Sequence, residues 1–274
     1  MDKDTIKRLI IEYQQFVANI TLIEREIHLS HQLNYVFVGL RRAGKSYLMY
    51  QQIQSLLNDG HQPEEILYFN FEDDRLVNLT VEDLDLIKVS YEELYPHKPI
   101  FFLDEIQIVE HWEKFARRLA DQQYRVYITG SNAKMLSAEI ATTLGGRYIV
   151  QNVYPFSFSE FLKASKIEIG PTWYYKNRTE IVRTFSDYFS YGGLPELMLI
   201  ETIEKRQWLS NLFNKIFFGD LITRYSIRND LAMKVLIRKL AESVKQPSSF
   251  NRLTNIVSTT GAKVSTDTII DYLN

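Results

Sequence analysis

Short apolar runs alternate with helical patterns along residues 34–150, and this alternation is the strongest constraint on the fold. The apolar runs predict five strands, at residues 34–39, 66–71, 100–103, 125–129 and 147–150. One helical pattern begins at Lys45 and ends near Asn58. Two more cover residues 81–94 and 111–122. Such alternation over short connections favours a parallel sheet covered by helices on both faces. We therefore predict an α/β core whose ligands bind outside the carboxyl ends of the strands.

The composition excludes several classes of protein. The 274 residues include 32 Lys or Arg and 34 Asp or Glu, a net charge of −2, which argues against a globally basic nucleic-acid-coating protein. A local basic patch stays open. The chain has no cysteine, so it holds no disulfide, cysteine zinc site, iron–sulfur cluster or thiol nucleophile. Since no apolar run approaches about 18–20 residues, we expect no membrane span and a cytoplasmic protein.

The turn after the first predicted strand matches the full pattern G-x-x-x-x-G-K-[ST] at residues 39–46. Glycine at Gly39 and Gly44 permits backbone conformations that let amides turn toward phosphate oxygens. The following helix presents unpaired N–H groups and the positive end of its dipole. We expect Lys45 to contact the β- and γ-phosphates and Ser46 to bind Mg²⁺. The predicted nucleotide-binding residues here are Gly39, Leu40, Arg41, Arg42, Ala43, Gly44, Lys45, Ser46 and Tyr47.

Two adjacent carboxylates, Asp104 and Glu105, end the apolar run of residues 100–103. A buried strand would place Asp104 beside the loop, where it can hold Mg²⁺ through water. Glu105 would then orient and deprotonate the attacking water. An exposed acidic turn is the alternative. GTPase patterns (D-x-x-G, N-K-x-D) and the L-S-G-G-Q transporter signature before the Asp strand are missing. The remaining branch of P-loop ATPases has an extra strand between the loop strand and the Asp strand, here residues 125–129.

Three further features are each open to more than one interpretation. Ser131 and Asn132 follow the fourth predicted strand, where a polar side chain can touch the γ-phosphate or the attacking water, or can cap the next helix. Arg147 begins the last strand; it could reach a neighbouring subunit's γ-phosphate and stabilise transition-state charge, or be a surface arginine or part of a structural ion pair. Arg41 and Arg42 could face phosphate, solvent or DNA.

Taken together, these motifs resemble the AAA+ P-loop ATPases of the AAA-14 type from bacteria and archaea, which are usually followed by the domain of unknown function DUF4143. The resemblance implies ATP and Mg²⁺ as ligands, a helical lid and a winged-helix segment. The resemblance also implies that Lys45 and Ser46 are the Walker A contacts and that Asp104 and Glu105 are the Walker B pair. It implies that Ser131 is the sensor 1 residue and that Arg147 acts as an arginine finger. The motifs are residues 39–46, 68–73, 103–107, 129–131, 146–147, 155–161 and 192–196.

The lid motif, residues 192–196, would place Pro195 near the adenine. Many AAA+ proteins have an arginine after that proline, and this chain has Glu196. A wing should follow the last predicted helix, yet the chain stops at Asn274, so we expect a C-terminally truncated protein. The expected segments are an N-terminal helical segment (1–33), the ATPase core (34–155), the lid (156–225) and a partial winged helix (226–274). Helices are expected over 4–29, 179–191, 204–218, 229–244, 250–259 and 265–273, with a capping box at Ser157 and Glu160.

Three functions follow from these features. The first is Mg²⁺-dependent ATP hydrolysis coupled to a conformational change that acts on DNA or a protein partner, with a homo-oligomer in which Arg147 acts in trans. The second is a nucleotide-gated DNA-binding switch with little or no hydrolysis, because residues 226–274 resemble a helix-turn-helix with a net charge of +3. The third is a protein-interaction module that docks through the aromatic helical region.

Overall fold

The computed structural model describes residues 2–76, 79–131, 142–167, 170–223, 225–244, 248–259, 261 and 264–273. They fall into two compact units, Met1–Thr202 and Ile203–Asn274, which are treated separately. Unit 1 contains α1 (Lys3–Asn19), β1 (Asn34–Gly39), α2 (Lys45–Asn58), η1 (Pro63–Glu65), β2 (Ile66–Asn70), α3 (Val81–Leu94), β3 (Ile100–Asp104), η2 (Ile106–Ile108), α4 (Trp112–Asp121), β4 (Val126–Ser131), β5 (Tyr148–Asn152), α7 (Phe158–Ala164), α8 (Trp173–Lys176), α9 (Arg178–Tyr191) and η3 (Pro195–Leu199).

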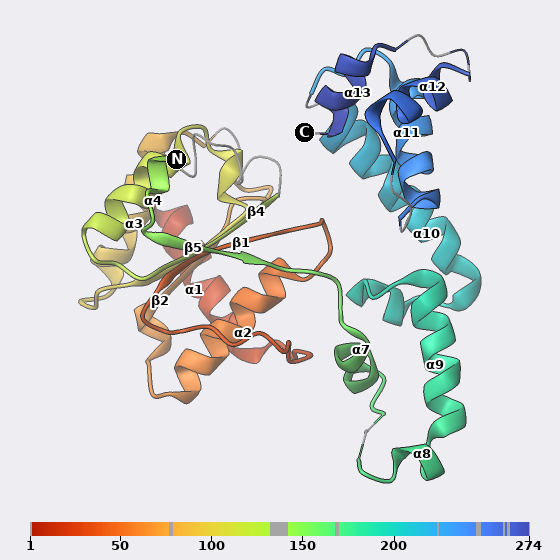
Figure 1. The fold of residues 1–274 in the computed structure, drawn as a ribbon. Helices are drawn as coiled ribbons and strands as arrows, with labels where there is room; N and C mark the ends of the chain where they lie inside the picture. Colours follow the sequence, from red (N-terminus) through yellow and green to blue (C-terminus); the bar gives the residue numbers. More distant parts are fainter. Residues whose placement is uncertain are drawn as a thin grey trace. The chain divides into compact units, whose positions relative to one another are not determined.

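Within the described residues, five strands form one parallel sheet in the order β2-β3-β4-β1-β5. Figure 1 shows the sheet with α2 on one face and α3 and α4 on the other. This confirms the predicted parallel α/β sheet. It also confirms the strand order, because β4 lies between β1, which leads into the loop, and β3, which ends in Asp104. The two acidic residues and the loop therefore come to the same edge.

Both faces of the sheet are covered, as the continuous apolar strands require. Alternate strand residues form one cluster with α3 and α4, and the other residues form a second cluster with α2. The first set contains Val36, Val38, Leu67, Phe69, Phe101, Leu103, Val126 and Ile128. The second contains Tyr35, Phe37, Ile66, Tyr68, Ile100, Phe102 and Tyr127. Burying each large apolar side chain contributes roughly 1.5–3 kcal/mol, so these two layers hold the sheet rigid.

The predicted helix over residues 4–29 is wrong in its length, because α1 ends at Asn19 and Ile20 is extended. The Gln54 side chain of α2 donates hydrogen bonds to the carbonyl oxygens of Val17 (3.2 Å) and Ile20 (2.8 Å). A side chain distant in sequence thus satisfies carbonyl groups at the end of this helix. The apolar residues after it pack against the α2 layer without being helical: Leu22, Ile27 and Leu29.

Gly39 ends β1 where another segment passes very close. A Cβ atom at this position would lie 2.1 Å from the carbonyl oxygen of Val153, the residue that follows β5. The Val153 N–H donates to the Val38 carbonyl oxygen at 2.7 Å. We expected Gly39 for its backbone freedom; its φ is not positive, and the actual reason is this close approach.

Helices follow the sheet, as predicted. The Ser157–Glu160 capping box begins α7, and Leu162, Ile167 and Ile181 form a small core with α9. Unit 2 holds α10 (Thr202–Lys215), the π-helix η4 (Ile216–Thr223), α11 (Asp230–Glu242), α12 (Phe250–Ser258) and α13 (Thr266–Leu273). The last three pack around Ala232, Leu236, Leu253, Val257 and Ile269. The four-segment division and the partial winged helix stay predictions.

Replacing Gly39 with alanine should destabilise the protein by about 1–3 kcal/mol, because the new Cβ collides with a backbone carbonyl that cannot rotate away. Urea unfolding of the variant measures this loss. Gly170→Ala is the control, since nothing lies within 4 Å of its Cβ and its φ is not positive. Equal stabilities of the two variants would contradict the steric explanation.

Candidate functional site

The turn between β1 and α2 holds a buried lysine above backbone oxygens. Gly44, the N-cap of α2, has φ +95°, a conformation that a residue with a side chain rarely adopts. Lys45 is 5% exposed, and its Nζ donates to the carbonyl oxygens of Gly39 and Leu40, both at 3.3 Å. It also lies 3.7 Å from Glu105 Oε1. The ammonium group is thus held over the turn that the sequence predicts to bind phosphate.

Asp104, at the end of β3, is buried among hydroxyl groups. Tyr68 donates to its Oδ2 at 2.8 Å, and Thr129 donates to its Oδ1. The Ser46 hydroxyl, from the first turn of α2, is close enough to Asp104 to lower its pKa. Burial raises the pKa of Asp104, and the three hydroxyl groups oppose this rise. The Tyr50 hydroxyl lies 3.1 Å from that of Tyr68, which extends the network.

Glu105 follows directly and has a left-handed backbone, with φ +57°. Its N–H donates to Thr129 Oγ1 at 2.8 Å, while its carboxylate accepts from the Gln107 amide. The Glu105 side chain is mostly buried but keeps some contact with solvent. A carboxylate of this kind, next to Lys45 and open on one side, can accept a proton from a bound water.

The residues present fit a magnesium ion that a bound nucleotide brings with it. Among the residues that the structure describes, no group of three or more His, Cys, Asp or Glu could hold a metal. Mg²⁺ is commonly held by one or two protein oxygens together with substrate phosphates. Ser46 and Asp104 supply a hydroxyl and a carboxylate near each other at the edge of the sheet where the loop lies.

The structure describes only part of the segment at the end of β4 that holds the predicted sensor residues, Ser131 and Asn132. In the register of β1 and β4, Ser131 is level with Gly39, so its backbone lies beside the loop. Asn132 lies outside the described residues. The roles predicted for both therefore stay predictions. Thr129, which the sequence analysis did not single out, is the β4 residue that contacts both acidic residues.

The other predicted loop residues have separate surroundings. Ala43 is buried, while Leu40 and Tyr47 are exposed. Arg41 lies 3.7 Å from Glu72. The side chains of Arg41 and Arg42 are partly exposed to solvent, and each guanidinium lies next to a carboxylate. Contacts of either arginine with phosphate or DNA stay predictions.

Arg147 lies at the opposite end of the sheet from the loop. It directly precedes β5, whose first residue, Tyr148, pairs with Asn34 at the start of β1. Its guanidinium forms an ion pair with Asp121 at the end of α4. Within one chain Arg147 thus makes the structural ion pair that the sequence analysis left open, and its action on a neighbouring subunit stays a prediction.

The predicted lid motif lies directly against the loop. Pro195 Cγ is 3.9 Å from the position that a Cβ of Gly44 would occupy. Glu196, which stands where many AAA+ proteins have arginine, forms an ion pair with Arg42 of the loop. The predicted position of Pro195 near the nucleotide is compatible with these contacts, and its contact with adenine stays a prediction.

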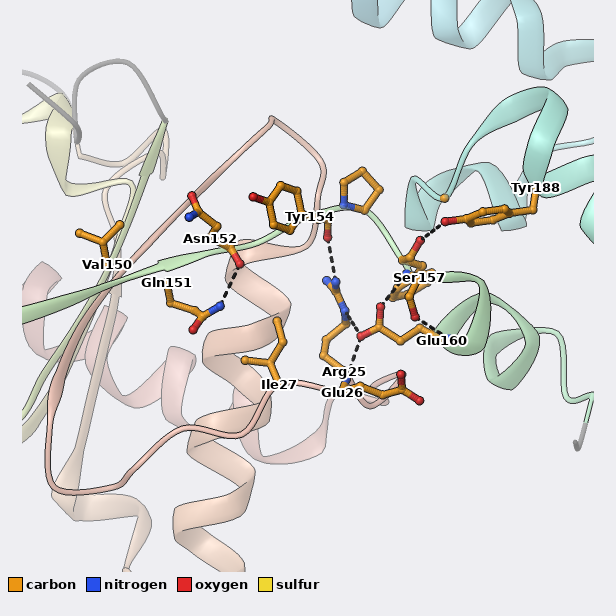
Figure 2. A pocket seen from close by; sticks show the side chains of 13 residues that line it. Arg25, Glu26, Ile27, Val150, Gln151, Asn152, Tyr154, Ser157, Glu160 and Tyr188 are labelled. Atoms are coloured by element: carbon orange, nitrogen blue, oxygen red, sulfur yellow. Dashed lines mark hydrogen bonds and ion pairs between the residues drawn. The ribbon is translucent and has the colours of Figure 1, made fainter. Parts of the chain in front are cut away.

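A buried ion pair that the sequence analysis missed joins the same parts of the chain. Arg25, in the irregular segment before β1, and Glu160 of α7 are each 4% exposed and lie 2.8 Å apart. Arg25 also donates to the carbonyl oxygens of Ala43 (3.0 Å) and Tyr154 (2.7 Å). Figure 2 shows the guanidinium between Tyr154 and Glu160. No local pattern marks Arg25; the only signal was Glu160 in its capping box.

Backbone groups around this ion pair form further hydrogen bonds with Glu160. Glu160 also accepts hydrogen bonds from the backbone N–H groups of Glu26 and Ser157, both at 2.8 Å. Burial alone would raise the pKa of Glu160, but Arg25 and these N–H groups outweigh it and lower the pKa below the usual 4.5. A pocket of about 810 Å³ adjoins the pair and is lined by residues of β5, α7 and α9 (Figure 2).

Comparison with known proteins gives a family and several relatives. Residues 31–162 match the AAA_14 model, described as an AAA domain. The uncharacterized protein MJ1544 of Methanocaldococcus jannaschii is 33% identical over 99% of this chain and 61% of its own length. An uncharacterized protein of Haemophilus influenzae is 32% identical over 92% of the chain and 64% of its own length. The chain thus spans less than two thirds of either relative.

Solved structures give weaker similarities. The Orc1 protein of Aeropyrum pernix, solved in complex with DNA, is 13% identical with a TM-score of 0.36, covering 98% of this chain and 81% of that one. A DNA polymerase III gamma subunit-related protein of Thermotoga maritima is 11% identical with the same TM-score, covering 97% of each chain. Similarities of this size carry no argument about function. Among the described residues, no helix is long and apolar enough to cross a membrane.

Glu160→Gln should destabilise the protein by about 3–5 kcal/mol at pH 7, because it leaves the buried Arg25 charge uncompensated. Since the pKa of Glu160 is lowered in the folded state, its contribution is present above pH 4.5 and is lost as the pH falls through the lowered value. The stability difference from wild type should therefore shrink in acid. Urea unfolding at several pH values measures it.

Glu26→Gln is the matched control, since Glu26 pairs with Lys163 at the surface. It should cost far less at pH 7. A Glu160→Gln loss equal to that of the control, or independent of pH, would contradict the role of the buried ion pair.

Proposed function

We propose that the chain is a Mg²⁺-dependent ATPase, because residues 31–162 match the AAA_14 family model, which is described as an AAA domain. One observation carries the proposal: Lys45, Ser46, Asp104 and Glu105 meet at the edge of the sheet, where Lys45 lies 3.7 Å from Glu105 and Ser46 lies close enough to Asp104 to oppose the rise of its pKa. A lysine, a hydroxyl and two carboxylates are the groups that hydrolysis of a nucleoside triphosphate needs.

Each residue has a defined task in this proposal. The loop amides and Lys45 bind the β- and γ-phosphates, and Lys45 exchanges its backbone oxygens for phosphate oxygens. Ser46 and Asp104 hold Mg²⁺, which neutralises charge on the phosphates when it is bound. Glu105 orients a water and takes its proton as the water oxygen bonds to the γ-phosphorus. The bond between the γ-phosphorus and the bridging oxygen then breaks, leaving ADP and phosphate.

The lid contacts support a coupling of hydrolysis to conformational change. Glu196 pairs with Arg42 inside the loop, and Pro195 lies against Gly44. A triphosphate at the loop offers Arg42 stronger acceptors than a single carboxylate. We infer that nucleotide binding and release alter this contact and so move the lid.

The surfaces of the described residues favour a protein over DNA as the partner on which such a movement acts. In the helix-turn-helix interpretation, α13 would enter the DNA groove, and its exposed face carries Asp267 and Asp271. Acidic side chains there repel phosphates. In unit 1, α9 exposes Val182, Phe185 and Phe189 on one face, and exposed aromatic residues of this kind are typical of protein interfaces.

Lys45→Ala should abolish nucleotide binding, because the loop loses the charge that faces the phosphates. Glu105→Gln should keep binding but lower kcat by about 10²–10⁴, because the amide cannot accept the proton. Titration with a fluorescent ATP analogue and release of phosphate measure the two effects. Glu110→Gln, an exposed carboxylate outside the site, is the control. Wild-type turnover by Glu105→Gln would show that the base is a different group.

An oligomer with Arg147 acting in trans predicts that specific activity rises with protein concentration. Arg147→Ala should then lower kcat by about 10³ and inhibit wild-type protein in mixtures. Asp121→Asn is the matched control, because it removes the ion-pair partner and keeps the arginine. Specific activity that does not depend on concentration would contradict the trans role.

A further inference from the structure

We propose that Thr129 is a positioning residue that fixes Asp104 and Glu105 relative to each other. The inference deepens the proposed ATPase function and rests on it. It assigns a role to a β4 side chain that stands before the polar residues predicted to sense the nucleotide.

The Thr129 hydroxyl bridges the two acidic residues. Thr129 is fully buried, its Oγ1 donates to Asp104 Oδ1, and the same oxygen accepts the Glu105 backbone N–H at 2.8 Å. The bridge follows from the strand register. Leu103 pairs with Ile128, so the next residues, Asp104 and Thr129, are level on neighbouring parallel strands.

The contact with Glu105 restrains a backbone that would otherwise be unfavourable. Glu105 has φ +57°, a conformation that costs energy for a residue with a Cβ and persists only when the surroundings enforce it. The Thr129 oxygen binds the N–H group of this peptide. It therefore helps to set the direction in which the Glu105 side chain leaves the main chain, toward Lys45 and Gln107.

Thr129 acts through these carboxylates and not by touching a phosphate. A hydroxyl group has one proton, and the proton of Thr129 is donated to Asp104. The position predicted to contact the γ-phosphate or water, Ser131, lies two residues further along β4. One hydroxyl thus links the residue expected to hold Mg²⁺ with the residue expected to activate water.

Tyr68 provides a matched comparison. Its hydroxyl donates to the other oxygen of Asp104 at 2.8 Å and lies 3.1 Å from the Tyr50 hydroxyl. Among the residues that the structure describes, its hydrogen bonds do not include Glu105. Tyr68→Phe therefore removes support from Asp104 alone, whereas Thr129→Val removes it from both acidic residues at nearly constant volume.

The experiment compares Thr129→Val, Thr129→Ser and Tyr68→Phe with the wild type. The first measurement is the affinity for a fluorescent ATP analogue as a function of Mg²⁺ concentration. The second is kcat at saturating ATP and saturating Mg²⁺. Thermal unfolding of each variant checks that the fold is intact.

Thr129→Val should raise the Mg²⁺ concentration for half-maximal binding about 10-fold, because residues that support metal ligands typically contribute 10–100-fold. Its kcat should stay about 10²-fold lower even at saturating Mg²⁺, since Glu105 is no longer held. Tyr68→Phe should shift the Mg²⁺ dependence and keep kcat within about 3-fold, because Glu105 keeps its contact. Thr129→Ser, which retains the hydroxyl, should restore both quantities.

Two results would overturn the inference. If kcat of Thr129→Val recovers at saturating Mg²⁺ as that of Tyr68→Phe does, Thr129 supports Asp104 only. If Thr129→Ser stays as impaired as Thr129→Val, the methyl packing and not the hydroxyl matters. A wild type that binds the analogue but hydrolyses no ATP would refute the proposed ATPase function separately, and the Mg²⁺ dependence of binding would still test whether Thr129 supports Asp104.

Discussion

The candidate site depends on the hydrogen-bonded register of three parallel strands. β1, β4 and β3 are neighbours, and their pairing brings Gly39, Ser131, Thr129 and Asp104 to one edge. A slip of one residue in any strand would turn its side chains to the other face and separate the acidic pair from the loop. The two apolar layers that cover the sheet prevent such a slip, because either face buries large side chains. Core packing and site geometry are therefore one constraint.

A second requirement is that segments far apart in sequence stay together around the loop. Arg25 makes this connection with one guanidinium, which reaches Glu160, the loop carbonyl of Ala43 and the carbonyl of Tyr154. A buried ion pair need not add net stability compared with apolar residues of similar size, but losing one partner is costly. The donor groups of Arg25 reach three separate segments, so this one side chain joins them around the turn.

The sequence predicts those parts of the fold and of the candidate site that depend on residues close together in the chain. Helix α3 has its predicted bounds, residues 81–94, and a capping box of Thr80 and Asp83 begins it. The loop pattern and the paired carboxylates located the site because their chemistry requires fixed spacing. The errors arose where distant residues decide: Gln54 at the end of α1, and Val153 against Gly39. Arg25 has no local pattern, and Thr129 belongs to the motif of residues 129–131 without a role of its own, because the partners of both residues become neighbours only in the folded chain. The catalytic and binding roles of the site residues stay predictions.

The contact between Gly39 and Val153 also has a mechanical consequence. The Val153 N–H is hydrogen-bonded to the Val38 carbonyl oxygen, and the Val153 carbonyl oxygen lies against Gly39, which begins the predicted phosphate-binding turn. The chain runs on from Val153 into α7, the first helix of the segment that we propose as a lid. A rotation of α7 about the end of β5 would therefore pivot next to the predicted phosphate-binding turn.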